Sequence, residues 1–91
     1  MKYDLYEALK QEGYTKKESN YGDIIEKNYK ALFQPIKVVA VFSTDHSVVT
    51  MKYYAGGCKR EFKNKVHLNE KRAYNAIMAT LYNNGVREAK A

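Results

Sequence analysis

The chain has 91 residues, of which 45% are hydrophobic, and a net charge of +6. These values indicate one small folded domain and argue against a disordered chain. The single cysteine, Cys58, excludes an internal disulfide. The sequence contains neither a secretory signal nor a long apolar run, so we expect a cytoplasmic protein. We expect one domain over residues 1–86 and a flexible tail over residues 87–91.

The positive charge is unevenly distributed along the chain. Residues 1–35 contain six lysines and six acids and are neutral, whereas residues 36–91 contain ten Lys and Arg against four acids. Residues 59–72 are the most basic stretch, with six basic residues and two acids. Such an asymmetry indicates a negatively charged partner that contacts one part of the molecule.

Helices are predicted near both ends of the chain. Asp4 with Glu7 three residues later is an acidic variant of the capping box, and Gly13 suits the end of this first helix. A last helix is expected after Asn69, its predicted N-cap, and the pair Asn84-Gly85 would end it. Its apolar stripe consists of Ala73, Tyr74, Ile77, Met78, Leu81 and Tyr82.

A further helix is predicted over residues 24–33. Asp23 with Glu26 matches an N-cap signal, and Pro35 disfavours continuation beyond residue 34. The apolar residues follow at helical spacing: Ile25, Tyr29, Leu32 and Phe33. A strand within Ile24–Leu32 is the alternative.

Three strands are predicted between residues 36 and 66 because β-branched and aromatic residues are frequent there. Gly56-Gly57 is a two-residue hairpin signal that places Ala55 opposite Cys58. A turn at Asp45-His46 places Phe42 opposite Val49. Both registers put the same apolar set on one face of the sheet. This set comprises Ile36, Val38, Ala40, Phe42, Val49, Met51, Tyr53, Ala55, Cys58, Phe62 and Val66.

The predicted fold is therefore α+β. It is a three-stranded antiparallel β-meander with helices packed on one face, in the order α(α)βββα. The other face of the sheet would stay open to solvent.

The sequence offers no convincing catalytic site. Cys58 falls on the predicted core face, His46 belongs to a predicted turn, and His67 precedes the last helix. Two histidines and one cysteine without clustered acids do not indicate a metal site. No phosphate-binding glycine motif occurs. We expect a protein that is not an enzyme and that uses no metal or other cofactor.

The basic residues indicate a nucleic-acid-binding surface. Several lysines alternate onto the open face, and basic residues also begin the last helix, where the helix dipole adds positive potential. Phosphate groups of DNA or RNA would contact these cations. The predicted nucleic-acid-binding residues are Lys37, Lys52, Tyr54, Lys59, Arg60, Lys63, Lys65, Lys71 and Arg72.

The order α-β-β-β-α is similar to that of the double-stranded-RNA-binding domain. Lys71-Arg72-Ala73 opens the last helix where that family carries lysines. Glu70 precedes this pair, Tyr74 follows it, and the glycine-rich approach to the helix is absent. The resemblance is one of topology, and no membership is inferred from it.

A protein partner is the alternative to nucleic acid. Valines among the lysines of the open face suit a surface that another molecule covers. The chain would then be a protein-interaction, accessory or inhibitory module, of the kind found in phages and mobile elements. Its partner would be an acidic protein or a second copy of the chain in a homodimer. The predicted interface residues are Val39, Val41, Val48, Thr50 and Tyr54.

Overall fold

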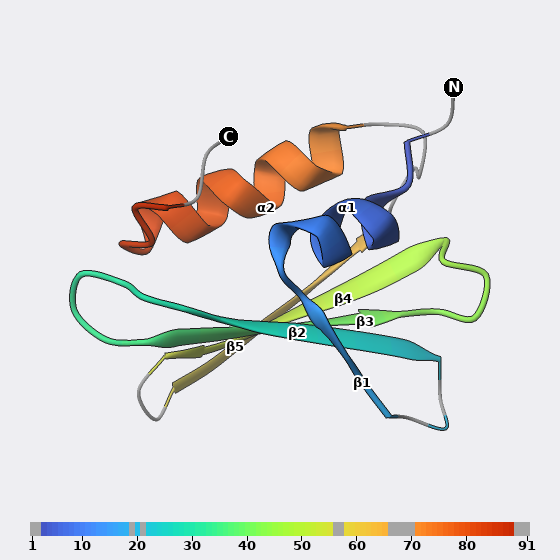
Figure 1. Cartoon of the computed structure of the whole chain (residues 1–91), viewed down its shortest axis with the longest axis horizontal. Helices are drawn as coiled ribbons and strands as arrows, with labels where there is room; N and C mark the ends of the chain where they lie inside the picture. The colour runs from blue at the N-terminus through green and yellow to red at the C-terminus, as the bar shows by residue number, and fades with distance from the viewer. Residues whose placement is uncertain (1–2, 19, 21, 56–57, 66–70, 89–91) are drawn as a thin grey trace.

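The computed structural model describes residues 3–18, 20, 22–55, 58–65 and 71–88, and for residues 58–65 it describes the backbone alone. The elements are α1 (Leu5–Glu12), β1 (Thr15–Lys17), β2 (Asp23–Tyr29), β3 (Ile36–Phe42), β4 (Val48–Ala55), β5 (Cys58–Lys65) and α2 (Arg72–Asn83). The strands form one antiparallel meander in chain order, and both helices lie on the same side of it (Figure 1). The fold is α+β: four long strands between two helices, with the three-residue β1 added at one edge.

Both predicted hairpin registers are confirmed. Phe42 pairs with Val49 and Ala40 with Met51 between β3 and β4. Ala55 pairs with Cys58 between β4 and β5. Because successive residues of a strand point to opposite faces, these registers fix which side chains face the helices.

The predicted helix over residues 24–33 is wrong, and the alternative of a strand is correct. Residues Asp23–Tyr29 form β2, which pairs along its whole length with β3. Ile25 and Tyr29 are buried, as period-two alternation requires, whereas Leu32 and Phe33 lie exposed in the loop that follows. The sheet therefore has four long strands rather than three, and the predicted order α-β-β-β-α does not hold.

The N-terminal helix has the predicted ends. The Asp4 carboxylate accepts the Glu7 N–H at 3.1 Å, and Gly13 follows the helix in the left-handed conformation, with φ +119°. The end of α2 is also as predicted, since Gly85 and Val86 donate their N–H groups to the carbonyls of Tyr82 and Leu81. This pair of bonds is a Schellman motif.

The beginning of α2 differs from the prediction. Its N-cap is Lys71, which makes no side-chain capping bond, and Arg72 is the first helical residue. The predicted N-cap, Asn69, lies outside the described residues. Arg87 and Glu88 form a turn after α2. The flexible tail over residues 87–91 stays a prediction, because residues 89–91 are not described.

The core lies between the helices and one face of the sheet. Leu5 and Leu9 of α1 and Ile77, Met78 and Leu81 of α2 are buried against the strands. The strands contribute Ile25, Tyr29, Ile36, Val38, Ala40, Phe42, Val49, Met51 and Tyr53. Within the described part of the chain, no helix is long and apolar enough to cross a membrane.

Candidate binding face of the sheet

The two faces of the sheet have different surroundings. In β3, Val38, Ala40 and Phe42 are fully buried beneath the helices. Lys37, Val39 and Val41 alternate with them and point to the other side, which no helix covers (Figure 1). We call this second side the open face.

Cross-strand pairing arranges the open face in rows that cross the sheet, and the first two of them begin at β1. The first row contains Lys17, Ile24, Val41, Thr50 and, by register, Lys63. The second contains Thr15, Glu26, Val39, Lys52 and, by register, Glu61. The third contains Asn28, Lys37, Tyr54 and, by register, Lys59. Val41 and Val39 thus occupy the middle strand, β3, in the first two rows, and each of the three rows contains at least one lysine.

A hollow of about 220 Å³ lies in the middle of this face. Ile24, Val39 and Val41 supply its apolar lining, and Val39 is only 9% exposed. Tyr54 and three lysines from three different strands complete it: Lys17, Lys37 and Lys52. We call these seven residues the lysine hollow. A ligand seated here would meet an apolar surface and three cations together.

One of the three lysines has an acidic partner. The Lys37 ammonium lies 3.2 Å from the Glu26 carboxylate on the neighbouring strand. Both side chains are partly exposed, so this ion pair contributes at most about 1 kcal/mol and a phosphate could compete for the lysine. Among the described side chains of the open face, Glu26 is the only acid. The face therefore keeps a positive balance.

The structure brings together some of the predicted nucleic-acid-binding residues and separates others. Lys37, Lys52 and Tyr54 line the lysine hollow. Register assigns Lys59, Lys63 and Lys65 to the same face, opposite Tyr54, Thr50 and Val48, whereas it assigns Arg60 to the helix side with Tyr53. The side chains of these four residues lie outside the described part.

Lys71 and Arg72 do not share the open face. They begin α2, and α2 lies in the layer on the other side of the sheet (Figure 1). A ligand that lies on the lysine hollow would therefore not contact the start of this helix. The open face alone remains as the candidate surface.

Two residues of the hollow, Lys17 and Ile24, were missed by the sequence prediction. Both depend on β2, which carries Ile24 and pairs with the strand of Lys17. Predicting residues 24–33 as a helix removed them from the sheet. The spacing of Ile25 and Tyr29 fits a strand as well as a helix, so the local sequence did not decide between the two.

The histidine of the β3–β4 turn has a structural role. The His46 Nε2 lies 2.6 Å from the Asp23 carboxylate, and its ring packs against Tyr6 and Phe42 on the helix side. This hydrogen bond lowers the pKa of Asp23. The His46–Asp23 pair connects the turn to β2 and lies away from the open face. Among the described residues, no group of three or more His, Cys, Asp or Glu could hold a metal ion.

The predictions for Cys58 and His67 are not tested, because the Cys58 side chain and His67 lie outside the described residues. In comparisons with known proteins, no family model, no curated protein and no solved structure matches the chain. The open face itself is therefore the basis on which a function can be inferred.

Proposed function

We propose that this protein is a small binding module that binds nucleic acid on the open face of its sheet. The observation that carries the proposal is the lysine hollow, in which Lys17, Lys37 and Lys52 surround an apolar floor. Lysines that bind phosphate oxygens release counterions from the nucleic acid, and this contributes affinity that does not depend on the base sequence. Val39, Val41 and Tyr54 would lie against sugars or bases.

The size of the face suits a nucleic-acid strand or duplex. Adjacent strands are about 4.8 Å apart, so five strands make a face about 19 Å across. The lysines of the hollow come from β1, β3 and β4, and register adds Lys59, Lys63 and Lys65 from β5. A polyanion that crosses the strands would contact several of them at once.

The proposal is tested by fluorescence anisotropy with labelled 16-mers of duplex DNA, duplex RNA and single-stranded DNA. Lys37→Glu with Lys52→Glu should weaken binding to every ligand at least tenfold, because two attractive contacts become repulsive. Lys10→Glu with Lys16→Glu is the control of equal charge change, since Lys10 is an exposed lysine of α1 and Lys16 pairs with the buried Ile25 on the helix side. Equal losses for both variants, or no binding by the wild type at low salt, would overturn the proposal.

A protein partner is a second candidate because the floor of the hollow is apolar. Val41 and Val48 are only partly buried on a side that no helix covers. A second copy that packs on Val39, Val41, Val48, Thr50 and Tyr54 would bury this surface. Sedimentation equilibrium decides between the two: a dimer that Val41→Lys dissociates, combined with no affinity for nucleic acid, would favour the homodimer.

A further inference from the structure

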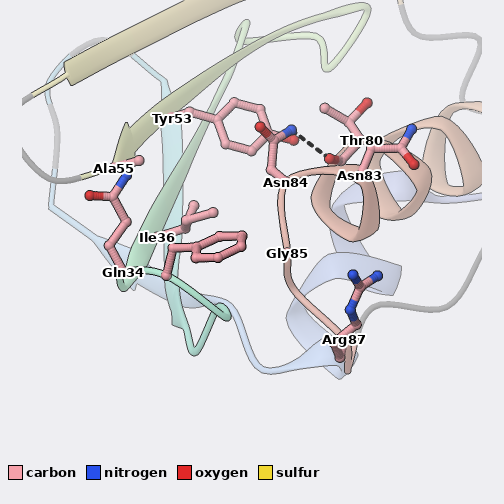
Figure 2. Close-up of a pocket in the computed structure, with 10 residues that line it drawn as sticks. Gln34, Ile36, Tyr53, Ala55, Thr80, Asn83, Asn84, Gly85 and Arg87 are labelled. Carbon is pink, nitrogen blue, oxygen red and sulfur yellow. Dashed lines mark hydrogen bonds between the residues drawn. The ribbon is translucent and has the colours of Figure 1, made fainter.

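A second hollow lies on the helix side of the sheet, at the end of α2. Its volume is about 600 Å³, within the range of small-molecule sites. Figure 2 shows Ile36 and Tyr53 reaching from the sheet toward the last turn of α2, with Gln34 and Ala55 at one side and Arg87 at another. Its lining consists of Phe33, Gln34, Ile36, Tyr53, Ala55, Thr80, Asn83, Asn84, Gly85 and Arg87. We call it the α2-end pocket.

The polar groups deep in this pocket already have partners within the protein. The Asn84 side-chain amide donates to the Thr80 carbonyl at 2.7 Å, the bond drawn in Figure 2. The Thr80 hydroxyl donates to the Ala76 carbonyl at 2.8 Å. Burial raises the pKa of Tyr53 to about 12. The interior therefore offers a ligand mainly the apolar surfaces of Ile36, Ala55 and the Tyr53 ring.

Phe33 is the least buried large apolar residue among the described ones, at 90% exposure. It lies in the β2–β3 loop, where the Leu32 N–H donates to the Gly85 carbonyl at 3.0 Å and so fastens the loop to the end of α2. The loop thus holds an aromatic ring at the edge of an apolar pocket. A ligand with an apolar body would cover this ring as well as the pocket floor.

The charge at the pocket is positive. Arg87 is the only charged residue among those described in the lining, and its guanidinium lies over the Tyr82 ring, 4.6 Å from its centroid. The C-terminal end of a helix carries a partial negative charge, which opposes an anion. However, the Thr80, Leu81 and Tyr82 carbonyls accept N–H groups of residues 84–86, and the full charge of Arg87 exceeds the remaining partial charge.

We propose that the α2-end pocket binds a small amphipathic anion, with its apolar body on Ile36, Ala55 and Phe33 and its anionic group at Arg87. This site is separate from the lysine hollow, because it lies on the other side of the sheet. A short aromatic or aliphatic carboxylate has the chemistry that the pocket fits. A second copy of the chain, which would insert its own Phe33, is the competing occupant.

The test uses three probes in ¹H–¹⁵N correlation spectra of the full chain: 2-naphthoate, the neutral 2-naphthamide, and acetate. We expect saturable shifts at Ala55, Asn83 and Gly85 with naphthoate, with a Kd on the order of 1 mM or below for a ligand of this size. Naphthamide should bind more weakly at the same residues. Acetate should produce no saturable shift, because it lacks the apolar body.

Variants separate the two parts of the site. Arg87→Gln should weaken naphthoate about 3- to 5-fold, the effect of one exposed ion pair, and leave naphthamide unchanged. Ala55→Phe, which fills the pocket, should weaken both probes at least tenfold, as should Phe33→Ala, which does not disturb the core. Lys10→Gln, at an exposed lysine of α1 that lines neither hollow, is the control and should alter neither affinity. Circular dichroism checks that each variant is folded.

Three results would overturn the proposal. The first is the absence of saturable shifts at the pocket with 10 mM of either aromatic probe. The second is an equal effect of Arg87→Gln on both probes. The third is a dimer by sedimentation that Phe33→Ala dissociates and that excludes the probes, which would identify a second copy as the occupant.

Discussion

The two faces of the sheet are formed by the same strands, but one face packs beneath the helices and no helix covers the other. The helix side buries Val38, Ala40 and Phe42 completely, so its residues are determined by packing. The open side has Lys37, Val39 and Val41 at the alternating positions of the same strand. Packing beneath a helix does not explain an apolar floor with three lysines around it. We infer that packing beneath the helices determines the residues of the helix side, whereas the open face is left for the proposed contact with nucleic acid.

The largest effect on stability is expected on the helix side. Phe42 is fully buried and packs edge-on against Tyr6, so Phe42→Ala should lower the free energy of unfolding by about 3–5 kcal/mol. Val41→Ala, one residue away on the open face, should cost less than about 1 kcal/mol. Urea unfolding followed by circular dichroism measures both. Similar costs for the two variants would contradict the division between the faces.

A glycine before β2 should give the next largest effect. Gly22 has φ +118°, and a Cβ there would lie 2.5 Å from the Phe42 carbonyl oxygen. Gly22→Ala should therefore lower the free energy of unfolding by about 1–3 kcal/mol because of the backbone conformation, and the close contact would add to this loss. Gly13 is the matched control, with φ +119° but only the flexible Lys27 side chain in the way. Urea unfolding of Gly13→Ala should show a smaller loss, and the reverse order would show that β2 tolerates displacement.

The dependence of the unfolding free energy on pH at low pH should reflect the β3–β4 turn. The Asp45 carboxylate accepts bonds from the Ser47 hydroxyl, the Ser47 N–H and the Ser43 hydroxyl, which lower its pKa to about 2. Because the folded pKa lies below the ordinary value of 3.8, this stabilisation is complete above about pH 4 and is lost as the pH falls toward 2. Asp45→Asn should make the unfolding free energy less dependent on pH between 4 and 2. An unchanged dependence would show that the turn opens without cost to the fold.

The smallest effect on stability is expected from the open face itself. Lys52→Gln together with Val48→Thr changes only partly exposed side chains, so the free energy of unfolding should change by less than about 0.5 kcal/mol per site. Thermal unfolding measures the change. A loss of several kcal/mol would show that this face is structural.

Local signals were sufficient to predict β3, β4 and β5 with their registers, but not β1 and β2. The two-residue Gly56-Gly57 signal and the Asp45-His46 turn set the registers of β3, β4 and β5, since a turn fixes which residues pair across it. The capping pattern of Asp4 and Gly13 likewise predicted both ends of α1, because these bonds form between neighbours in sequence.

The prediction failed at β2 because its signals fit two periods. Ile25 and Tyr29 are four residues apart, which suits one face of a helix and one face of a strand equally. Leu32 and Phe33 continue the helical spacing and therefore favoured a helix, yet both are exposed in the loop. Asp23 and Glu26, interpreted as a helix start, instead pair with His46 and Lys37, which are distant in sequence. Tertiary contacts of this kind leave no local pattern.

The candidate site was predicted in part for the same reason. Lys37, Lys52 and Tyr54 followed from the hairpin registers, whereas Lys17 and Ile24 required β2 to join the sheet. The α2-end pocket was not predicted, because it forms where residues 33–36 and 53–55 meet residues 80–87, which only the packing of α2 brings together.

The central claim is that the lysines of the open face hold a polyanion, and the salt dependence of affinity tests it most directly. With three lysines of the hollow on duplex DNA, log Kd plotted against log salt concentration should have a slope of at least about 2.7. Lys37→Gln with Lys52→Gln should lower this slope by about 1.8, whereas Lys10→Gln should leave it unchanged. A slope near zero in the wild type, or the same slope in all three proteins, would contradict the claim.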